Sequence, residues 1–505
     1  QQVWDNRGIR IDVEALPEPD PITAELIRNG RTIGCFQIES PAMRTLLRNT
    51  LADNTDMLIK TLSLVRPGPS GSGMKKRFIA RHLGKEPTEY LHPSLERVLG
   101  DTYGVMLYQE DILKVANVIA GMDLAEGDML RRAMTKDRSP REMARSMKTF
   151  IEKAVANGVE ESVAEEIWGL IANFAAYSYC KAHASTYGEI SYQCTYLKAH
   201  FPAEFMACVL SNRGGFYHPA VYVEEAKRLG IEVRPPDINK SRFEYAAEGD
   251  TIRVGFVEVR QLAHGTVEAI LAARTERPFE SLGDVWARTG MTRPEAEALI
   301  QAGAFDAFGR TRPALFWELH LLAQGKREEA PVNADRLFRE HGGEYRTVPR
   351  LPDISRKKRT DQEWEALGLV VSTHPLEYYA PLFQERALVS STDLPRYVDR
   401  VVMLVGWLIA ERRVGLKGRG CMKFCTFEDP KGVFEAVLFS ETYQRYGHLL
   451  DSHGPYFVLG KVQDDDNYCS VIVEELERVD VRPKSPGASD ITPPKHWIFP
   501  GAQGE

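Results

Sequence analysis

The sequence has no long hydrophobic run. No stretch of its 505 residues approaches the ~20 uninterrupted apolar residues that a membrane helix needs. The first residues, Gln1-Gln2-Val3-Trp4-Asp5, have no basic segment followed by an apolar core, so we predict neither a signal peptide nor a membrane partner. An initiating Met is also missing, which leads us to expect a fragment of a longer protein.

Cysteine is scarce as well. The 7 cysteines are odd in number and scattered, which suits neither a disulfide framework nor a tetrahedral zinc site. Only Cys421 and Cys425 lie close together, and we interpret them as small residues of a strand. Because this usage fits a reducing compartment, we predict a cytoplasmic protein.

What is present is the composition of an ordinary globular protein. Hydrophobic residues make up 43% and charged residues 27% of the chain, which excludes a disordered or fibrous protein. The length predicts about three to five domains. There are 64 Lys+Arg against 71 Asp+Glu, a net charge of −7. This mild acidity argues only weakly against nucleic acid, because the distribution of charge matters more than its total.

Hydrophobic periodicity predicts a mainly helical first part. Residues 108–200 carry several apolar stripes at helical spacing, and we interpret them as core rather than as a cofactor site. Short helices are predicted at Thr266–Arg274 and Arg293–Ala302, and the latter is followed by the turn Gly303-Ala304-Phe305-Asp306. The polar segment 321–362 contains a basic run at residues 356–359.

After about residue 400 the pattern becomes β-rich. The predicted strands are Val401–Leu408, Met422–Glu428, Phe434–Phe439, Tyr456–Val462 and Tyr468–Val473. A helix is predicted near Tyr443–Leu450. Five short strands with such a helix suit a small oligonucleotide-binding barrel.

A basic segment lies between Lys60 and Lys85, with seven cations and no acidic residue. We interpret it as an irregular loop rather than a packed element. Within it, Arg66-Pro67-Gly68-Pro69 presents an arginine from a stiff bend, because proline fixes φ. A purely structural turn and a functional presentation of Arg66 remain equal alternatives.

Two adjacent arginines, Arg131 and Arg132, stand in the run Leu130–Lys136, and Asp123 is the predicted N-cap of the helix that carries them. Neighbouring arginines cannot point the same way from a helix. They can brace one anion from two sides, or one can grip the anion while the other pins the helix. A triphosphate or a DNA backbone is the obvious anion, and a solvated charged face is the alternative.

A second candidate anion site lies in the segment Phe174–Ser185, where one predicted helix ends and the next begins. The free N–H groups of the new helix favour an anion there. Lys181 can hold a phosphate and His183 can donate a hydrogen bond to one. The alternative is a capped helix junction with a satisfied core histidine.

These motifs form an ordered series. The series runs through Gly34–Ser40, Arg66–Pro69, Thr102–Val105, Tyr108–Glu110, Leu130–Lys136, Lys181–Ala184, Tyr192-Gln193 and Leu197–His200. Over about residues 20 to 475 the chain resembles the alpha subunit of bacterial DNA polymerase III, including its error-prone relatives. Thr373-His374-Pro375-Leu376 also looks like the family's run before its barrel.

The resemblance implies a multidomain fold with a mainly α fingers domain, a tandem helix-hairpin-helix module and a β-barrel OB-fold. The expected divisions are fingers 1–212, linker or end of the fingers 213–250, helix-hairpin-helix 251–320, linker and candidate clamp-binding region 321–395, OB-fold 396–480 and tail 481–505. Arg131 and Arg132 are expected to contact the incoming dNTP, supported by Arg66, Lys181 and His183. The expected DNA contacts are Lys75, Lys76, Arg77, Arg260, Gly303, Arg412, Arg413, Lys417 and Arg419.

The sequence departs from the family in two motifs. The first hairpin of the family resembles Val-Lys-Gly-Leu-Gly, whereas this chain has Val259-Arg260-Gln261-Leu262-Ala263. Loss of both glycines argues against a backbone contact to phosphate there, and the second hairpin at Gly303 fits better. The nearest candidate for a peptide that binds the sliding clamp, ending in Leu337-Phe338, lacks the expected Gln, and a plain helix face is the alternative.

A polymerase needs carboxylates that hold two metal ions. In this family they belong to a palm domain upstream of the present residues, so we expect Mg²⁺ to serve the full polymerase and not to bind this chain. Asp464-Asp465-Asp466 is interpreted as a solvated turn. We therefore predict a DNA polymerase portion that acts in replication or error-prone repair with a palm-bearing partner and is inactive alone. A non-catalytic accessory half or remnant of a split polymerase is the alternative.

Overall fold

The computed structural model describes residues 1–65, 73–135, 140–175, 179–325, 348–384, 386–416, 420–464 and 468–479. They form two compact units. The helical unit consists mainly of Ile11–His200, and the hairpin–barrel unit contains Gln1–Arg10 together with most of the chain from Phe201 onward. The predicted division of residues 1–212 as one fingers domain therefore differs from the two units, which separate at residues 10/11 and 200/201.

The helical unit confirms the helices expected over residues 108–200. Its elements are α2 (Pro21–Arg28), α3 (Pro41–Thr50), α4 (Thr55–Leu64), α6 (Met74–His82), α7 (Glu96–Leu99), α8 (Gln109–Ala120), α9 (Leu124–Thr135), α10 (Pro140–Ala156), α11 (Glu161–Ala175) and α12 (Lys181–His200), with short 3₁₀ turns at Pro93–Leu95 and Gly100–Thr102. Ile112, Ile119, Ile167 and Phe174 are buried, as two of the apolar stripes predicted. The interpretation of the third stripe as core was wrong, because α12 buries small and polar residues such as Ala184 and Ser191 and leaves the stripe half-buried; the stripe consists of Tyr187, Ile190, Cys194 and Leu197. Burial of one face per helix is what holds these short helices in place.

The basic segment contains more regular structure than the sequence predicted. Lys60 lies on α4, and Lys75, Lys76 and Arg77 lie on α6 rather than in an irregular loop. The reason is that α6 buries an apolar face made of Met74, Phe78 and Ile79. The dense positive charge on its exposed side hid this periodicity.

In the hairpin–barrel unit, the segment 213–250, expected to be a linker or the end of the fingers, contains regular elements. It contains α14 (Pro219–Arg228), β1 (Glu232–Arg234) and β2 (Ala246–Glu248), next to α13 (Pro202–Asn212) and α1 (Gln2–Arg7). β3 (Thr251–Arg253) lies between β1, which is parallel to it, and β2, which is antiparallel. The boundary expected between residues 250 and 251 therefore falls inside the β2–β3 hairpin.

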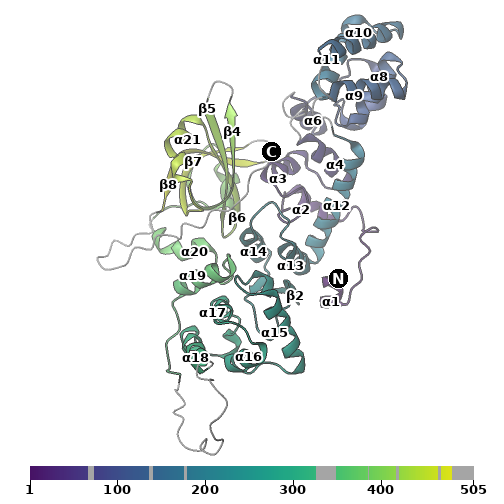
Figure 1. The fold of residues 1–505 in the computed structure, drawn as a ribbon. Helices are drawn as coiled ribbons and strands as arrows, with labels where there is room; N and C mark the ends of the chain where they lie inside the picture. The colour runs from purple at the N-terminus through teal and green to yellow at the C-terminus, as the bar shows by residue number, and fades with distance from the viewer. Residues whose placement is uncertain are drawn as a thin grey trace, which may run out of the picture. The chain divides into compact units, whose positions relative to one another are not determined.

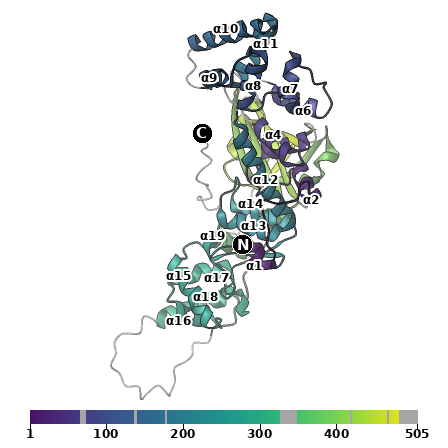
Figure 2. The ribbon, with the colours of Figure 1, turned by 90° about the vertical axis from the view of Figure 1, so that its right-hand side faces the viewer.

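The next helices gather into one bundle in Figures 1 and 2. They are α15 (His264–Glu276), α16 (Leu282–Thr289), α17 (Arg293–Ala302), α18 (Arg312–Gly325) and, beyond the segment 326–347, α19 (Arg356–Leu367). α15 and α17 confirm the two short helices predicted from the sequence. Ile270, Val285, Leu299 and Leu315 are buried between them.

The last part is a closed barrel, visible in Figure 1. Short turns of helix precede it at α20 (Pro375–Tyr379) and at residues 380–382 and 391–397. Its elements are β4 (Val401–Leu416), β5 (Gly420–Asp429), β6 (Gly432–Leu438), α21 (Ser440–Tyr446), a 3₁₀ turn at Gly447–Leu449, β7 (Tyr456–Asp464) and β8 (Cys469–Arg478). Neighbouring strands follow the order β4-β5-β6-β8-β7, and β4 also pairs with β7. All pairs are antiparallel except β6 with β8. This confirms the predicted OB-fold, with its helix between the third and fourth strands.

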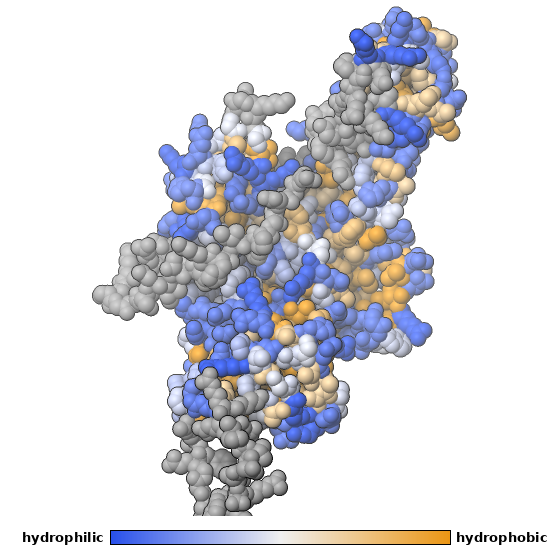
Figure 3. All heavy atoms as spheres, viewed as in Figure 1, coloured by the Kyte–Doolittle hydropathy of each residue, from blue (hydrophilic) through white to orange (hydrophobic). Residues whose placement is uncertain are grey.

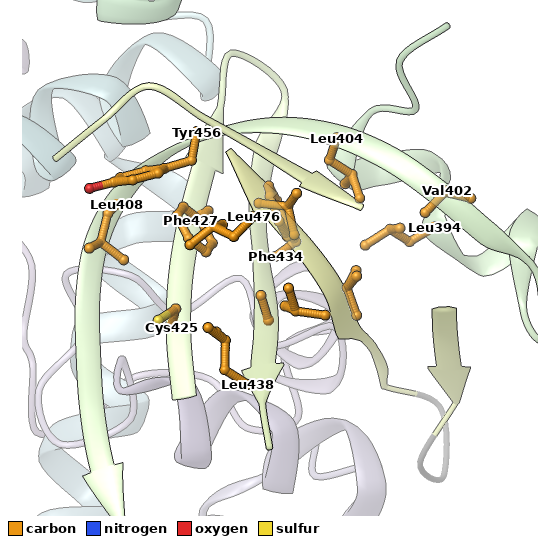
Figure 4. Close-up of a cluster of buried hydrophobic side chains, with 14 of the residues drawn as sticks. Leu394, Val402, Leu404, Leu408, Cys425, Phe427, Phe434, Leu438, Tyr456 and Leu476 are labelled. Atoms are coloured by element: carbon orange, nitrogen blue, oxygen red, sulfur yellow. The ribbon is translucent and has the colours of Figure 1, made fainter. Parts of the chain in front are cut away.

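The barrel interior is filled by inward-facing side chains of every strand, as Figure 4 shows. Phe427 and Phe434 stack with ring centroids 5.5 Å apart, and the Tyr456 hydroxyl donates to the Leu449 carbonyl at 2.8 Å. Cys425 is fully buried in this core, in line with its interpretation as a small strand residue.

The outer surface is mixed in character. The face drawn in Figure 3 is mostly hydrophilic, with hydrophobic residues scattered among the polar ones. Among the helices that the structure describes, none is long and apolar enough to cross a bilayer.

Candidate nucleotide and nucleic-acid sites

α9 begins at the cap that the sequence predicted. The Glu126 N–H donates to the Asp123 carboxylate at 2.8 Å, and the Asp123 N–H donates to the Glu126 carboxylate at 3.1 Å. Gly127 lets α9 approach α8 closely, because a Cβ there would lie 3.3 Å from the Leu113 Cα. The cap and the close approach together fix the position of the arginines one turn later.

Arg131 and Arg132 share one carboxylate, that of Asp128. Arg131 donates to Asp128 Oδ1 from Nε at 3.0 Å and from Nη2 at 2.8 Å. Arg132 Nε lies 2.7 Å from Asp128 Oδ2. The hydrogen bond from Arg131, together with the charge of both arginines, outweighs burial and lowers the pKa of Asp128. The two cations thus converge on a carboxylate of their own helix, whereas the anion expected from the sequence was a triphosphate or a DNA backbone.

The two arginines differ in exposure. The Arg131 side chain is 23% exposed and also donates from Nη1 to the Gln109 side chain at 3.1 Å. The Arg132 side chain is 71% exposed. Arg131 therefore ties α9 to the start of α8, whereas Arg132 extends toward solvent.

The start of α8 is held rigidly. Asp111 accepts hydrogen bonds from the Leu107 and Tyr108 N–H groups, both at 3.0 Å. This carboxyl is only 2% exposed, and burial raises its pKa in spite of those two bonds. Gln109 and Glu110, the next residues along, are thereby placed against α9 and α12.

The predicted anion site at the start of α12 contains a carboxylate of the protein itself. The Lys181 N–H donates to Glu110 Oε2 at 3.0 Å, and the Lys181 ammonium lies 5.2 Å from the centre of the Tyr108 ring. Lys181 and His183 are both exposed, so the alternative of a satisfied core histidine is wrong. His183 instead packs against the rings of Tyr179 and Tyr187.

The three expected DNA contacts of α6 lie on its outer side. Lys76 and Arg77 are exposed and Lys75 is half-buried. Arg77 Nε lies 3.8 Å from a Glu86 carboxylate oxygen, and a pair this exposed contributes little stability. These cations form a solvated basic face.

The first hairpin of the tandem module keeps its turn without glycine. Gln261 takes the left-handed conformation at φ 64°, which a glycine adopts at lower cost. Arg260, Gln261, Ala263 and His264 are exposed. The Arg260 N–H donates to the Ala366 carbonyl at 2.8 Å, which anchors the loop on α19.

Glu295 of α17 braces this hairpin. It accepts from the Ala263 N–H at 3.1 Å and from the Thr266 hydroxyl at 2.6 Å, and its other oxygen accepts from the N–H and the hydroxyl of Thr292. Burial raises the pKa of Glu295, but these hydrogen bonds outweigh it and the pKa is lowered overall.

The second hairpin has the expected glycine, Gly303, but this glycine is not accessible to solvent. Gly303 sits at φ 89° and its N–H donates to the Ile300 carbonyl at 3.1 Å. A Cβ on it would meet Arg312 Nη2 at 2.6 Å, and Arg312 is 1% exposed. Gly303, Ala304 and Phe305 are all buried. The internal hydrogen bond of its N–H and its covered surface argue against the expected phosphate contact at Gly303.

On the barrel, Arg412 and Arg413 of β4 are exposed as expected. Arg413 donates to the Cys421 sulfur at 3.3 Å, and its guanidinium lies 6.0 Å from the centre of the Tyr443 ring. Arg412 pairs across the sheet with Phe424. The two arginines thus put charge beside aromatic rings on two sides of one strand.

Several expected site residues lie outside the described residues. They are Arg66, Lys417, Arg419 and the clamp-binding candidate Leu337-Phe338, together with Asp465 and Asp466. Across the described ranges, no group of three or more His, Cys, Asp or Glu side chains is arranged to hold a metal ion. The described carboxylates therefore do not fit the two-ion site of a polymerase.

The sequence did not single out Asp128, and it gave Gln109 and Glu110 only as part of a motif, without their contacts. Asp128 could have been found from its spacing, since it stands three and four positions before the arginines, where helical side chains meet. The contacts of Gln109 and Glu110 join separate helices, so spacing alone could not reveal them.

Comparison with known proteins defines the class. Residues 1–158 match the model of the bacterial DNA polymerase III alpha subunit finger domain, and residues 230–315 match a helix-hairpin-helix motif. With the barrel that follows, this is the arrangement of a polymerase finger domain joined to nucleic-acid-binding modules.

Curated relatives give the family. An error-prone DNA polymerase of Symbiobacterium thermophilum is 33% identical over 93% of this chain and 47% of the relative. The DNA polymerase III alpha subunits of Haemophilus influenzae and Thermus aquaticus are each 34% identical, over 90% and 96% of this chain, and each is covered to 41% of its own length. The chain belongs to the family of bacterial DNA polymerase III alpha subunits and spans less than half the length of these relatives.

A search of solved structures found an asparaginyl-tRNA synthetase of Pyrococcus horikoshii complexed with asparaginyl-adenylate. The match covers 23% of this chain and 26% of the synthetase chain, with 22% sequence identity and a TM-score of 0.16. A similarity this low supports no comparison of folds.

Proposed function

We propose that this chain binds the incoming dNTP and the template–primer DNA for a template-directed DNA polymerase. The observation that carries the proposal is the pair of guanidinium groups around the Asp128 carboxylate on α9. Arg131 also bonds Gln109, whose neighbour Glu110 accepts from the Lys181 N–H. Two guanidinium groups that share a carboxylate can also share a phosphate, because both anions accept forked, charge-assisted hydrogen bonds.

The two arginines divide the work. Arg132, with most of its side chain in solvent, makes the first contact with a phosphate group. Arg131 bonds both Asp128 and Gln109 and keeps α9 in register with α8, so that the arriving anion meets a prepared surface. Positive charge fixed in this way stabilises negative charge on a transferring phosphoryl group.

The reaction that the family implies is attack of a primer 3′-hydroxyl on the α-phosphate of a dNTP, in replication or error-prone repair. Metal ions held on carboxylates support such a step in polymerases. No step is assigned to a metal on this chain, since its described carboxylates do not form that site. The chain's own part is to bind, orient and neutralise charge, and a palm-bearing portion would supply the rest.

DNA contacts are assigned to three exposed basic surfaces. Lys75, Lys76 and Arg77 form the first on α6, Arg260 lies on the first hairpin, and Arg412 and Arg413 lie on the barrel. Contacts of this kind to the phosphate backbone position a nucleic acid without reading its sequence. The first hairpin replaces Gly303 in this assignment, because it is the accessible one of the two.

The decisive experiment measures binding of a labelled dNTP to the chain and to its Arg132→Ala variant. Loss of a charge-assisted contact is expected to weaken binding about 10- to 100-fold. Arg145→Ala is the matched control, because Arg145 is an exposed arginine on α10 of the same unit. Equal binding by the chain and the Arg132→Ala variant would overturn the proposal.

Primer extension then tests the enzyme. With Mg²⁺ and a palm-bearing polymerase portion, Arg131→Ala is expected to raise KM for dNTP and lower kcat. Extension by this chain alone would contradict the assignment of the metal site to another portion. DNA binding without extension in either mixture would favour the accessory, non-catalytic alternative.

A further inference from the structure

A row of aromatic rings runs along one side of α12. Tyr179, His183 and Tyr187 recur every fourth residue, with ring centroids 5.1 Å apart for Tyr179–His183 and 4.0 Å apart for His183–Tyr187. Phe36, from the loop before α3, continues the row at 5.1 Å from Tyr187. Each of the four rings contacts the next, and we call Tyr179, His183, Tyr187 and Phe36 together the aromatic row.

The row is not a buried core. Phe36 is 37% exposed, His183 is exposed, and Tyr179 and Tyr187 are half-buried. By contrast, Phe150 and Trp168, which pack together elsewhere in the same unit, are buried at 0% and 4%. Aromatic rings held in series at a surface bind planar, π-rich groups, and every nucleobase has such a face.

One end of the aromatic row, at Tyr179, adjoins Gln109, the residue that bonds Arg131. The Gln109 N–H donates to the Tyr179 carbonyl at 2.8 Å, and the Gln109 side chain accepts from Arg131 at 3.1 Å. Lys181 stands between Tyr179 and His183 and is exposed. Charge for phosphates and rings for bases thus lie next to each other, which is the combination that single-stranded nucleic acid requires.

We propose that the aromatic row is a stacking surface for unpaired bases of the template strand. The inference rests on the proposed function, since it assumes that the helical unit handles DNA. It goes beyond that proposal in naming the ligand as unpaired nucleobases and in placing them on Phe36 and Tyr187, which no phosphate contact involves.

The test compares a labelled oligo(dT) strand with an abasic strand of equal length, which has the same charge but no bases. The variants are Phe36→Leu and Tyr187→Leu, which keep apolar bulk and lose the ring. Each is expected to weaken oligo(dT) binding about tenfold and to leave abasic binding unchanged. The slope of affinity against salt should stay as in wild type, because no cation is removed.

The matched control is Tyr196→Leu. Tyr196 is half-buried on the same helix and packs on His200 at 4.3 Å. It stands nine residues after Tyr187, on about the opposite face of a helix with about 3.6 residues per turn. This variant should bind both strands as wild type does, and Tyr187→Phe should restore binding.

The outcomes separate the two proposals. A wild-type chain that binds neither strand refutes the proposed function itself. Unchanged oligo(dT) binding by both Leu variants, or equal losses on both strands, overturns stacking on the row. Weaker dTTP binding with unchanged oligo(dT) binding would assign the rings to the incoming nucleotide and overturn the template assignment.

A second measurement needs no variant. Photo-crosslinking of an iodouracil-substituted strand to the wild-type chain is expected to attach it to residues of the row. Crosslinks confined to other parts of the chain would contradict the proposal even if a Leu variant failed to fold.

Discussion

The two hairpins of the helix-hairpin-helix module invert what their sequences suggest. The first lacks glycine, yet Gln261 holds the left-handed turn and the loop is exposed. The second has Gly303, yet Arg312 covers it and its N–H bonds within the protein. A glycine marks a backbone shape, whereas a phosphate site also needs an accessible surface. This difference is why we propose DNA contact for the first hairpin and structural support for the second.

Removal of the Arg312 side chain should have the largest effect. Its guanidinium bonds the Asp306 carboxylate at 2.9 Å and the Gln301 carbonyl at 2.7 Å. Arg312→Ala should lower the stability of the module by about 3–4 kcal/mol, because a cavity and an unpaired carbonyl remain. Hydrogen exchange in α15–α18 measures this. Arg310→Ala, at a 51% exposed arginine paired with Glu318, should change little.

Gly303→Ala comes next. A left-handed alanine is strained, and its Cβ would displace the guanidinium of Arg312. The expected cost is about 2 kcal/mol in the same exchange experiment. Duplex DNA affinity should remain that of wild type at temperatures where the module is folded. A specific loss of DNA affinity without loss of stability would restore Gly303 as a phosphate contact.

Glu295→Gln tests the brace of the first hairpin. The amide keeps one acceptor oxygen and loses the other, at an expected cost of about 1–1.5 kcal/mol. Hydrogen bonding holds the folded pKa of Glu295 below its usual range in spite of burial. The carboxylate's contribution is therefore fully present above the unfolded pKa of about 4.3 and is lost as pH falls through the lower folded pKa. The difference in free energy of unfolding between wild type and variant, measured by urea titration, should be constant near pH 7. It should disappear in acid.

Gln261→Glu has the smallest expected effect. It should weaken duplex binding by about 1 kcal/mol, because it places a negative charge near a phosphate in high-dielectric solvent. Gln261→Gly is the control and should leave affinity unchanged, since glycine accepts the same turn. Fluorescence anisotropy on a short duplex at two salt concentrations gives both values. Equal affinity for the Glu and Gly variants would remove the first hairpin from the DNA surface.

Much of the fold could be predicted from the sequence because its periodicities were clean. Helices α8 and α11 and the five barrel strands each show one regular apolar face. α12 does not, because it buries small and polar residues such as Ala184 and Ser191. β4 continues to Leu416, past the predicted end at Leu408, because the polar residues Glu411, Arg412 and Arg413 pair with β5 without an apolar signal. α6 was missed for the same reason, since charge masked its small buried face.

The candidate site could be predicted only in part. Charged side chains such as Arg131, Arg132 and Lys181 were found because their types and spacing suit an anion. Asp128, the partner of both arginines, could have been found from its helical spacing. The contact of Glu110 with Lys181 could not, because it joins residues 71 positions apart in the sequence. The sequence favoured the second hairpin over the first as the phosphate contact. It could not reveal the burial of Gly303, which depends on Arg312, a residue of the following helix.

The closed pairing of the barrel restricts how another protein can attach to it. Each of its strands is hydrogen-bonded to two neighbours, and β4 divides its length between β5 and β7. An incoming peptide could therefore add as an extra strand, a common route of β-augmentation, only where a strand segment has a single partner, as residues 410–416 of β4 have in β5. A protein that docks elsewhere on the barrel must use side chains and the connecting loops, and a point substitution on the outer face can alter such docking without unfolding the barrel.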